Sequence, residues 1–562
     1  MRIVIVGGVA GGMSCAARAR RLDEQAEIIV LDRGDHVSFA NCGLPYYVGG
    51  EITDEAALLV QTPASLKASL NLDVRVRHDV LGLDPVSRSL TVSTPTGIDT
   101  IGYDALVLSP GAQALRPAIP GLDSPRVHTL RSVADATTLQ ELASAARRAV
   151  VLGGGFIGLE TAEALAARGV DVTVVELADH VLPPLEAELA ALVEDELRRL
   201  GVTVRDGRAA TAIVPGEAAD TVVLADGTEL QADLVVLSVG VRPDTAVFEQ
   251  AGAACERGAL IVDDHGRTSL PQVWAVGDAT LSVDAVSGTR RPVALAGPAN
   301  RAGRLVADDI LGVAPARDVP RPLGTSIVRI GSLTAAMTGA NRATLVSRGI
   351  EHHTVHLHPN QHAGYFPGAV PVHLVVHFAA SDGRLLGAQA VGAEGVDKRI
   401  DVLATALRNG MDITGLIDLD LAYAPPYGNA KDPITMAGLV GDNVLTGVTR
   451  LWHWWEVDDV LDSALVLDAR SRQEFAGGHL PGALNIPHTE LRERVDEVRE
   501  AAAGRPVRVM CAAGVRSYIA HRVLVANGFD SASLSGGIAT LRAGLGRRAD
   551  VLLQPDLVPE HA

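Results

Sequence analysis

The sequence predicts an α/β protein of several domains, two of which are Rossmann-like nucleotide-binding folds. Its 562 residues exceed what one hydrophobic core usually serves. A glycine-rich loop joins a short apolar strand to a helix near the amino terminus, and a second such arrangement begins after residue 148. Apolar residues make up 47% of the chain and charged residues 21%, a balance typical of folded globular proteins without long disordered stretches.

The first nucleotide-binding unit opens with an apolar strand over residues 3–6 and continues into a helix over 13–22. A second strand over 27–31 ends at Asp32, whose carboxylate is placed to bind a ribose hydroxyl. The loop before the helix reads Gly7-Gly8-Val9-Ala10-Gly11-Gly12. Because valine occupies the middle glycine position of G-x-G-x-x-G, this loop alone is equally compatible with an ordinary strand-turn-helix whose glycines serve packing.

The second unit satisfies the motif in full. A strand over 149–152 leads into the loop, and the next strand, 172–175, ends at Glu176. The loop reads Gly153-Gly154-Gly155-Phe156-Ile157-Gly158. Its glycines let the backbone approach a pyrophosphate, and Glu176 can accept hydrogen bonds from the adenosine hydroxyls. A carboxylate at this place would repel a 2′-phosphate, so we expect NADH to be preferred over NADPH.

Charge and cysteine content exclude several function classes. The net charge is -18 and no dense basic patch occurs, which argues against nucleic-acid binding. No apolar run is long enough to span a bilayer, and the amino terminus lacks the features of a signal peptide. The cysteines, Cys15, Cys42, Cys255 and Cys511, are widely spaced, which disfavours a disulfide framework and a structural zinc site. We expect a cytoplasmic protein with free thiols, in which Cys15 and Cys255 are packing residues.

Two dinucleotide loops in one chain indicate hydride transfer between a flavin and a nicotinamide. Further segments follow in order: 106–112 with Gly111, 239–243 with Gly240, and Val273-Trp274-Ala275-Val276-Gly277-Asp278-Ala279. Together with both loops, this set resembles the flavin-dependent pyridine nucleotide-disulfide oxidoreductases over roughly residues 1–440. The resemblance implies FAD and NADH as cofactors, with Asp278 holding the ribityl chain of the flavin.

The resemblance also implies a domain order. Residues 1–112 and 236–318 are expected to form an FAD-binding domain, 113–235 an NAD-binding domain, and 319–445 an α+β dimerisation domain.

Cys42 lies in a segment without a neighbouring cysteine, so an internal disulfide with a close partner is not available to it. The segment reads Ser38-Phe39-Ala40-Asn41-Cys42-Gly43-Leu44-Pro45. It resembles the single-cysteine branch of the family, which contains coenzyme A-disulfide reductases, NADH-dependent persulfide reductases, and NADH oxidases and peroxidases. The resemblance implies that Cys42 is the redox centre and that Ser38 and Asn41 bind the flavin cofactor. Oxidases and peroxidases carry a histidine where this chain has Ala10, which counts against oxygen or peroxide as the main substrate.

Tyr365 and Tyr423 stand where coenzyme A-disulfide reductases carry tyrosines that reach the active site across a dimer. The resemblance implies a homodimer in which a phenol donates a proton to the leaving thiolate, and packing of the interface is the alternative role. Arg21 matches an arginine used for coenzyme A in those reductases, and Lys67 is a second cation expected to bind substrate phosphates.

Five histidines lie between residues 352 and 362, and His356 and His358 would share one face of a strand. No acid or cysteine joins them at a known ligand spacing. We therefore expect an amphipathic strand of the third domain and no metal site.

The pattern changes after Gly441. Residues 446–455 are expected to be a linker, and strands are expected over 465–467 and 507–510. The second strand leads into Cys511-Ala512-Ala513-Gly514-Val515-Arg516-Ser517, after which a helix is expected. Residues 448–562 resemble a single rhodanese domain. Backbone N–H groups of the loop can converge on the Cys511 sulfur and Arg516 adds positive charge, so the loop can hold a persulfide anion.

The residues and the resemblance together imply an FAD-dependent NADH oxidoreductase. It would reduce coenzyme A disulfide, coenzyme A persulfide or polysulfide through a mixed disulfide or persulfide on Cys42, while Cys511 delivers sulfane sulfur. Coenzyme A would be a substrate or a bound carrier. One alternative is an NADH oxidase or peroxidase with an accessory rhodanese domain, and another is a protein that is chiefly a sulfurtransferase. Expected partners are small-molecule thiols, disulfides and persulfides and a second copy of the chain.

Overall fold

The computed structural model describes residues 1–553 and 555. Residues 554 and 556–562, the end of the expected rhodanese domain, lie outside the described residues. The chain divides into two compact units, of which the first comprises residues 1–181 and 197–324 and the second comprises 182–196 and the chain from 325 onward.

The first unit contains a parallel sheet in the order β20-β7-β1-β2-β3. Its strands are β1 (Arg2–Val6), β2 (Glu27–Leu31), β3 (Asp73–Arg75), β7 (Ala105–Leu108) and β20 (Val273–Ala275). In register, Val4 lies between Ile29 and Leu106. Strands buried on both faces carry continuous apolar runs, and residues 3–6 and 105–108 are buried throughout.

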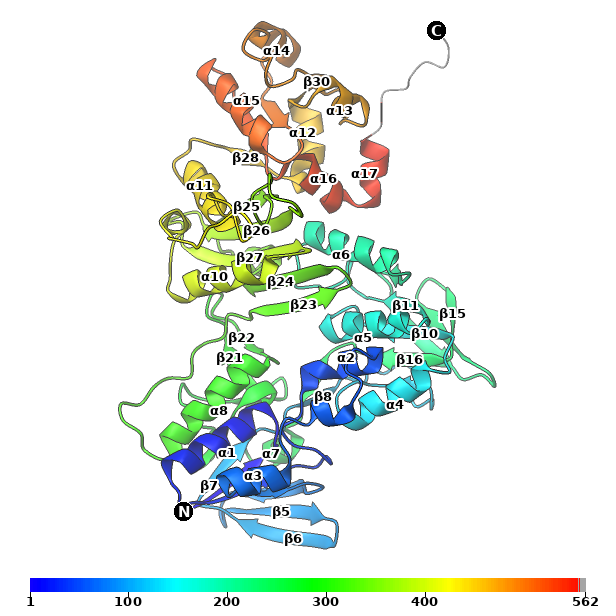
Figure 1. Cartoon of the computed structure of the whole chain (residues 1–562), viewed down its shortest axis with the longest axis vertical. Coiled ribbons are helices and arrows are strands. Elements are labelled where there is room, and N and C mark those ends of the chain that lie inside the picture. Colours follow the sequence, from blue (N-terminus) through cyan, green and yellow to red (C-terminus); the bar gives the residue numbers. More distant parts are fainter. Residues whose placement is uncertain (554, 556–562) are drawn as a thin grey trace. The chain divides into compact units, whose positions relative to one another are not determined.

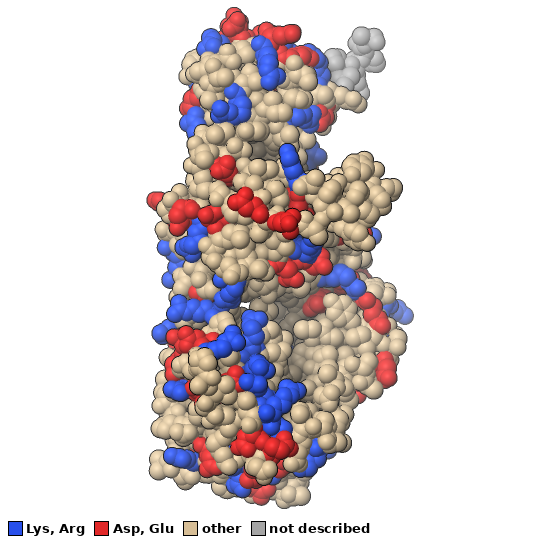
Figure 2. Space-filling model, turned by 60° about the vertical axis from the view of Figure 1, so that its left-hand side comes forward, with Lys and Arg blue, Asp and Glu red and all other residues tan. Residues whose placement is uncertain are grey.

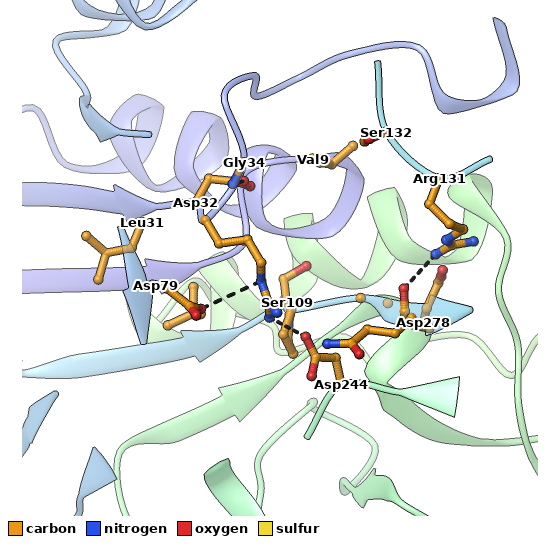
Figure 3. A pocket seen from close by; sticks show the side chains of 18 of the residues that line it. Val9, Leu31, Asp32, Gly34, Asp79, Ser109, Arg131, Ser132, Asp244 and Asp278 are labelled. Carbon is orange, nitrogen blue, oxygen red and sulfur yellow. Dashed lines mark hydrogen bonds and ion pairs between the residues drawn. The ribbon is translucent and has the colours of Figure 1, made fainter. Parts of the chain in front are cut away.

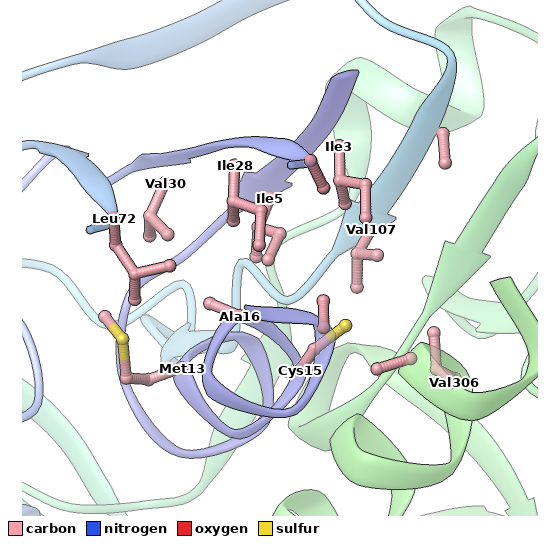
Figure 4. Close-up of a cluster of buried hydrophobic side chains, with 14 of the residues drawn as sticks. Ile3, Ile5, Met13, Cys15, Ala16, Ile28, Val30, Leu72, Val107 and Val306 are labelled. Carbon is pink, nitrogen blue, oxygen red and sulfur yellow. The ribbon is translucent and has the colours of Figure 1, made fainter. Parts of the chain in front are cut away.

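Helices α1 (Ala10–Leu22) and α8 (Ala296–Ile310) lie side by side on one face of this sheet (Figure 1). Figure 4 shows Met13 and Cys15 of α1 directed at Ile3, Ile5 and the neighbouring strand residues of the core. Cys15 is fully buried there, which confirms its assignment as a packing residue. The helix begins at Ala10 rather than Met13, because the last glycines of the loop already form its first turn.

A second parallel sheet in the first unit has the order β12-β11-β10-β16-β9. Its strands are β9 (Val127–His128), β10 (Arg148–Leu152), β11 (Asp171–Val175), β12 (Thr203–Arg205) and β16 (Leu234–Leu237). Helices α4 (Val133–Ala143) and α5 (Phe156–Ala167) and the antiparallel strands β13 (Ala210–Val214), β14 (Asp220–Leu224) and β15 (Glu229–Ala232) accompany it. Both predicted Rossmann-like folds are confirmed by these two sheets.

The remaining elements of the first unit are short. They are η1 (Asn41–Gly43), α2 (Leu44–Gly49), η2 (Glu55–Leu58), α3 (Pro63–Leu70), β4 (Asp79–Asp84), β5 (Ser89–Thr94), β6 (Gly97–Gly102), β8 (Ala112–Ala114), β17 (Val241–Pro243), α7 (Ala246–Gln250), β18 (Cys255–Glu256), β19 (Ala259–Ile261), η3 (Gly277–Ala279), β21 (Thr280–Val283) and β22 (Arg290–Pro292).

The second unit contains an antiparallel sheet in the order β23-β24-β27-β26-β25. Its strands are β23 (Ser326–Ile330), β24 (Leu333–Gly339), β25 (His352–Leu357), β26 (Val372–Ala379) and β27 (Leu385–Gly392). Its helices are α6 (Ala187–Arg199), α9 (Arg342–Ser347), α10 (Val396–Arg408) and α11 (Pro433–Leu445), with a turn at η4 (Thr414–Leu416). The expected amphipathic character of β25 is wrong, because residues 354–357 are buried on both faces of the strand.

A second sheet of this unit is parallel and has the order β28-β32-β31-β29-β30. Its strands are β28 (Leu451–Trp452), β29 (Leu465–Asp468), β30 (Leu484–Asn485), β31 (Val507–Met510) and β32 (Ser531–Leu534). Around it lie η5 (Trp454–Glu456), α12 (Val457–Ser463), α13 (Arg472–Ala476), α14 (Val495–Ala502), α15 (Val515–Ala526), α16 (Gly537–Leu545) and α17 (Arg547–Leu552).

Two expectations for this region are corrected. The expected linker 446–455 contains β28, and Trp452 is 2% exposed with its indole N–H donating to the Val509 carbonyl at 3.2 Å. The helix after the cysteine loop begins at Val515 rather than beyond Ser517, so Arg516 lies in its first turn.

Acidic and basic side chains both occur over the face that Figure 2 shows. Although the net charge is -18, the acidic residues do not form a single patch on this face. Within the described residues, none of the helices combines the length and apolar character needed to cross a membrane.

Candidate active site

A cavity of about 500 Å³ opens at the carboxyl ends of the first sheet (Figure 3). That volume is within the range of small-molecule sites, which run from about 300 to 1,000 Å³. The predicted cofactor residues that line it are Gly7, Gly11, Asp32, Asn41, Gly111, Gly277 and Asp278. Val9 lines the cavity too, although it occupies the middle glycine position of the motif.

The two glycine loops share one packing arrangement. Gly7 and Gly153 have φ of +95° and +104°, a conformation that favours glycine. A Cβ at Gly12 would overlap the Gly7 carbonyl oxygen, and a Cβ at Gly158 would overlap that of Gly153. Each helix can therefore sit tightly against its loop, which brings its N-terminal N–H groups to the carboxyl end of the sheet.

Asp32 and Glu176, the acids that follow the second strand of each nucleotide-binding fold, are held in the same way. The Asp32 carboxylate accepts hydrogen bonds from the backbone N–H groups of Gly8 and Gly34, both at 2.8 Å. The Glu176 carboxylate accepts them from Gly154 at 2.6 Å and Ala178 at 2.8 Å. Burial raises the pKa of Asp32, and the two N–H groups oppose that effect. Each acid is thus fixed beside its glycine loop with oxygen lone pairs left for ribose hydroxyls.

Charged side chains define the far wall of the cavity. Arg131 approaches Asp278 (Figure 3); burial raises the pKa of Asp278, and the positive charge of Arg131 opposes that effect. Arg33 is paired with Asp244, and its Nε lies 3.7 Å from Asp79. Bare glycine backbone at one end, a ribose-binding acid beside it and polar groups along a long cavity are the features that FAD requires, so the residues fit this cofactor.

Gly12, Ser38 and Gly240 are predicted cofactor residues that do not line this cavity. Ser38 adopts a left-handed φ of +50°, and its N–H donates to the Gly8 carbonyl at 2.8 Å, so it shapes the loop. Gly240 lines a smaller cavity near Arg131 and Ile157, at the start of the second glycine-loop helix.

Cys42 lies in η1, immediately before α2. It is an exposed residue, yet partial desolvation of the sulfur raises the pKa of its thiol, and the Glu160 carboxylate raises it further. Tyr46, one helical turn along, hydrogen-bonds Glu160 of α5 through its hydroxyl at 3.3 Å. Sequence reasoning missed Glu160, which directly follows the second glycine loop and is brought to Cys42 by the packing of α2 on α5.

The second unit brings Tyr365 and Tyr423 together. Their hydroxyl oxygens lie 3.2 Å apart, and the residues are 77% and 48% exposed. The hydrogen bond with Tyr423 raises the pKa of Tyr365. Phe366 and Tyr427 are exposed nearby in sequence, so an aromatic surface faces solvent in the single chain.

The predicted substrate cations have different surroundings. Arg21 is exposed at the end of α1. Lys67 of α3 donates to the side-chain oxygen of Asn71 at 2.6 Å.

Cys511 follows β31 and is 1% exposed. The Gly514 N–H donates to its sulfur at 3.2 Å, and the Ser517 hydroxyl lies 3.3 Å from it. Ser517 in turn donates to the Gly514 carbonyl at 2.9 Å and accepts from Ser533 at 2.9 Å. The sulfur therefore sits at the base of a polar cradle made by the loop and the start of α15.

Arg516 forms an ion pair with Glu474. Its two terminal nitrogens each lie 2.7 Å from an oxygen of Glu474, which belongs to α13. The hydrogen bond from Arg516 lowers the pKa of Glu474 to about 2. Sequence reasoning did not single out Glu474; its spacing from Ser471 fits a capping box, which the structure contains.

Most of the histidine-rich stretch forms β25, the edge strand of the antiparallel sheet of the second unit. His356 contacts Glu188 and Ser535, and His358 contacts His373 and Thr540. Across the described residues, no group of three or more His, Cys, Asp and Glu side chains is arranged to hold a metal ion.

Two glycine-loop nucleotide folds, a thiol at the head of a helix and a second thiol in a backbone cradle define a flavin-dependent oxidoreductase with an added sulfur-handling domain. Residues 1–303 match the pyridine nucleotide-disulphide oxidoreductase family, 325–433 match its dimerisation domain, and 455–543 match the rhodanese-like domain. The chain belongs to the pyridine nucleotide-disulphide oxidoreductases and is an oxidoreductase of the kind that uses FAD and NADH.

Relatives with known names fall into two groups. The coenzyme A disulfide reductase of Staphylococcus haemolyticus is 33% identical over 444 residues, which span 78% of this chain and 98% of that protein. The reduced Bacillus anthracis CoADR-RHD structure is 39% identical with a TM-score of 0.95, covering 98% of this chain and 99% of that one. The NAD-dependent persulfide reductase of A. fulgidus is 36% identical with a TM-score of 0.90, covering 96% of this chain and all of that one.

Proposed function

We propose that the protein is an FAD-dependent NADH oxidoreductase that reduces coenzyme A disulfide, coenzyme A persulfide or polysulfide at Cys42. The names of the relatives, coenzyme A disulfide reductase and NAD-dependent persulfide reductase, support the substrate class. In this assignment residues 1–112 and 236–318 bind FAD, 113–235 bind NADH, 319–445 form a homodimer interface, and 448–562 handle sulfane sulfur.

The observation that carries the proposal is the state of Cys42. It is exposed at the head of α2, and all four cysteines, which lie in the described part of the chain, are free. A thiol without a partner thiol must pass through a mixed disulfide or a persulfide with its substrate. The Cys42 thiolate attacks one sulfur of the substrate and a new S–S bond forms. The leaving group is coenzyme A thiolate from the disulfide, coenzyme A thiolate or hydrosulfide from the persulfide, and a shortened polysulfide anion or hydrosulfide from polysulfide.

FAD, when bound, supplies the electron pair that NADH delivers for cleavage of this S–S bond. Cleavage returns Cys42 to the thiolate and, from the mixed disulfide, releases the second thiol. One proton from solvent balances each NADH consumed. The Glu160 carboxylate acts on the Cys42 thiol, and the Tyr46 hydroxyl donates to Glu160. Glu160 is therefore the side chain proposed to pass such a proton.

The exposed Tyr365 and Tyr423 support the homodimer. Two adjacent phenols on an aromatic surface are suited to face the Cys42 site of a second copy, where Tyr365 would protonate the leaving thiolate. Arg21 and Lys67 would bind the phosphates of coenzyme A, for which Lys67 must exchange Asn71 for the substrate. Free cysteines fit a reducing compartment, so we also propose a cytoplasmic location.

Cys511 would load sulfane sulfur from polysulfide or thiosulfate and pass it to the acceptor. The Gly514 N–H, which donates to the sulfur, is suited to stabilise a persulfide anion there.

One alternative has specific support. The water-forming NADH oxidase of Lactobacillus brevis has a TM-score of 0.76 at 27% identity, covering 80% of this chain and 99% of that one. Ala10 in the first glycine loop argues against it, because this chain lacks the histidine expected of an oxidase there.

The deciding experiment is anaerobic NADH oxidation by the purified holoenzyme with coenzyme A disulfide, coenzyme A persulfide or polysulfide as sole acceptor, with sulfide measured. We expect turnover that depends on the acceptor, with sulfide released from the last two. Turnover with oxygen or peroxide alone at a higher kcat/KM would favour the oxidase. Sulfur transfer to cyanide that is unaffected by NADH, with negligible acceptor reduction, would favour a sulfurtransferase.

A further inference from the structure

The turn that joins β32 to α16 is hydrogen-bonded to the loop that begins at Cys511. The Ile538 N–H donates to the Cys511 carbonyl at 2.8 Å, and the Ala539 N–H donates to the Ala512 carbonyl at 3.2 Å. A Cβ at Gly537, whose φ is +65°, would lie 2.6 Å from the Cys511 carbonyl oxygen. The first turn of α16 therefore fixes the two successive peptide groups that follow Cys511 and Ala512.

The other side of the same turn rests on the antiparallel sheet of this unit. The His356 N–H donates to the Ser535 hydroxyl oxygen at 3.1 Å, and the His356 Nδ1 lies 2.8 Å from that oxygen. A Cβ at Gly536 would lie 2.7 Å from the Cβ of His356. His358 reaches the Thr540 hydroxyl of α16 at 2.8 Å. Figure 1 shows β25 and α16 as neighbours at this place.

A buried acid completes the arrangement. His356 Nε2 lies 2.7 Å from Glu188 of α6, and both residues and Ser535 are 4% exposed or less. Because an ionised carboxylate only accepts, Nε2 carries the ring proton and donates to Glu188. In the neutral ring Nδ1 then accepts from the Ser535 hydroxyl, so the carboxylate sets both the tautomer and the orientation of the ring.

We propose that Glu188 and His356 are positioning residues for sulfur transfer at Cys511. They lie outside residues 455–543, which match the rhodanese-like domain, and they act on its thiol through Ser535 and the Gly536-Gly537 turn. Because the turn holds the Cys511 and Ala512 carbonyls, it sets the direction of the loop N–H groups, including that of Gly514. The inference rests on the proposed sulfur-loading role of Cys511.

Substitutions of His356 separate its two side-chain bonds. His356→Asn keeps an acceptor at the Nδ1 position for Ser535 and loses Glu188, whereas His356→Gln keeps a donor near Nε2 for Glu188 and loses Ser535. His353→Asn is the matched control, because His353 lies on the same strand but packs against Phe378. Glu188→Gln retains an acceptor for Nε2, and Glu188→Ala does not.

The readouts are kcat for sulfur transfer from thiosulfate to cyanide and the pH dependence of Cys511 alkylation, mapped by mass spectrometry in the full-length holoenzyme. Misplacement of a reacting group by a remote change can cost up to about 100-fold in rate. We expect His356→Gln and Glu188→Ala to lose roughly 10-fold in kcat and to shift the alkylation midpoint upward, while His356→Asn and Glu188→Gln retain more activity. NADH-dependent coenzyme A disulfide reduction, which does not use Cys511, should stay within twofold and show that each variant folds.

An unchanged kcat and alkylation profile in His356→Gln and Glu188→Ala would overturn the inference. Equal losses in the asparagine and glutamine variants of His356 would also overturn it, because simple loss of packing predicts that result. If the wild-type chain transfers no sulfur, the proposed role of Cys511 fails, and the alkylation profiles still decide whether Glu188 and His356 position the thiol.

Discussion

The guanidinium of Arg516 donates two hydrogen bonds of 2.7 Å each to the two carboxylate oxygens of Glu474. The negative charge of a Cys511 thiolate interacts with this pair, since it is one of the influences that raise the pKa of Arg516. Arg516 therefore does not present a free positive charge to the sulfur. Glu474 cancels much of it and fixes its direction.

Removing the Glu474 charge should make Cys511 more reactive. In Glu474→Gln the Arg516 charge is no longer offset, so we expect Cys511 to be alkylated faster at neutral pH, whereas Arg516→Met should slow its alkylation. The rate of Cys511 alkylation, mapped by mass spectrometry, measures both effects. Glu490→Gln is the matched control, since Glu490 pairs with Arg472 and Arg494. Slower alkylation in Glu474→Gln would show that fixing the direction of Arg516 matters more than its net charge.

Cys42→Ser should reduce NADH-dependent reduction of coenzyme A disulfide by about 1000-fold or more, because no other nucleophile replaces the thiolate. Cys15→Ala is the control: Cys15 is fully buried and desolvation raises its pKa to about 12, so it is not a nucleophile at neutral pH. Stopped-flow reduction by NADH followed by acceptor turnover separates the two half-reactions. Substantial acceptor turnover in Cys42→Ser would contradict the proposed route.

Tyr365→Phe removes the hydroxyl that hydrogen-bonds Tyr423 and that would protonate the leaving thiolate. If the pair donates the proton to the leaving thiolate, kcat should fall roughly 10- to 100-fold, with less loss for acceptors whose thiols have a low pKa. Tyr427→Phe, an exposed neighbour, should keep the wild-type kcat. A loss that is independent of the leaving-group pKa would point to interface packing instead.

The wild-type enzyme should use NADH with a higher kcat/KM than NADPH. Glu176 is held at the end of β11 by two backbone N–H groups, where its charge opposes a 2′-phosphate. Glu176→Ala should narrow the NADH to NADPH ratio by about 10-fold or more, the usual worth of a hydrogen bond to a charged group. Asp171→Asn, at the opposite end of the same strand, should leave the ratio unchanged. Equal kcat/KM values for NADH and NADPH in the wild type would contradict the role of Glu176 in excluding NADPH.

The second unit should lose stability in acid through Glu186. Burial raises the pKa of this carboxyl, but the hydrogen bond and charge of His377 and the contacts of Arg342 outweigh burial and lower the pKa to about 2. Because the folded-state pKa lies below the ordinary value of 4.5, the stabilisation is present above pH 4.5 and is lost as pH falls toward 2.

We expect roughly 1 to 3 kcal/mol of this stabilisation to be absent from Glu186→Gln at neutral pH. The urea midpoint, followed by tryptophan fluorescence, should fall more steeply with acid in the wild type than in the variant. Three of the four tryptophans lie in this unit, at residues 452–455. Glu351→Gln, an exposed site, should follow the wild type. Parallel acid profiles for the wild type and Glu186→Gln would contradict the prediction.

The strand, loop and helix of each nucleotide-binding unit could be predicted, because their residues are adjacent in the sequence. The positions of Asp32 and Glu176 at the ends of their strands follow from the sequence, since a strand, a tight loop and the next strand form one contiguous unit. Val9 departs from the glycine motif, but the glycines that must lack a Cβ, Gly7 and Gly12, are both present.

Long-range partners could not be predicted in this way. Glu474 and Arg516 are far apart in sequence and meet because α13 and α15 follow neighbouring strands. The sequence does not distinguish Leu451 and Trp452 from a linker, since a two-residue strand has no periodicity of its own and forms by pairing with β32. The pattern around His356 likewise does not indicate its contacts with Glu188 and Ser535.

The strand order of the first sheet has a consequence for synthesis. β7 pairs with β20 on its outer edge, and the whole second nucleotide-binding fold lies between them in sequence. On the ribosome, the apolar edge at residues 105–108 emerges long before residues 273–275, while the inserted fold can already close. An open apolar edge is a template for pairing with other chains. The β7 edge therefore stays unpaired until residues 273–275 have been translated.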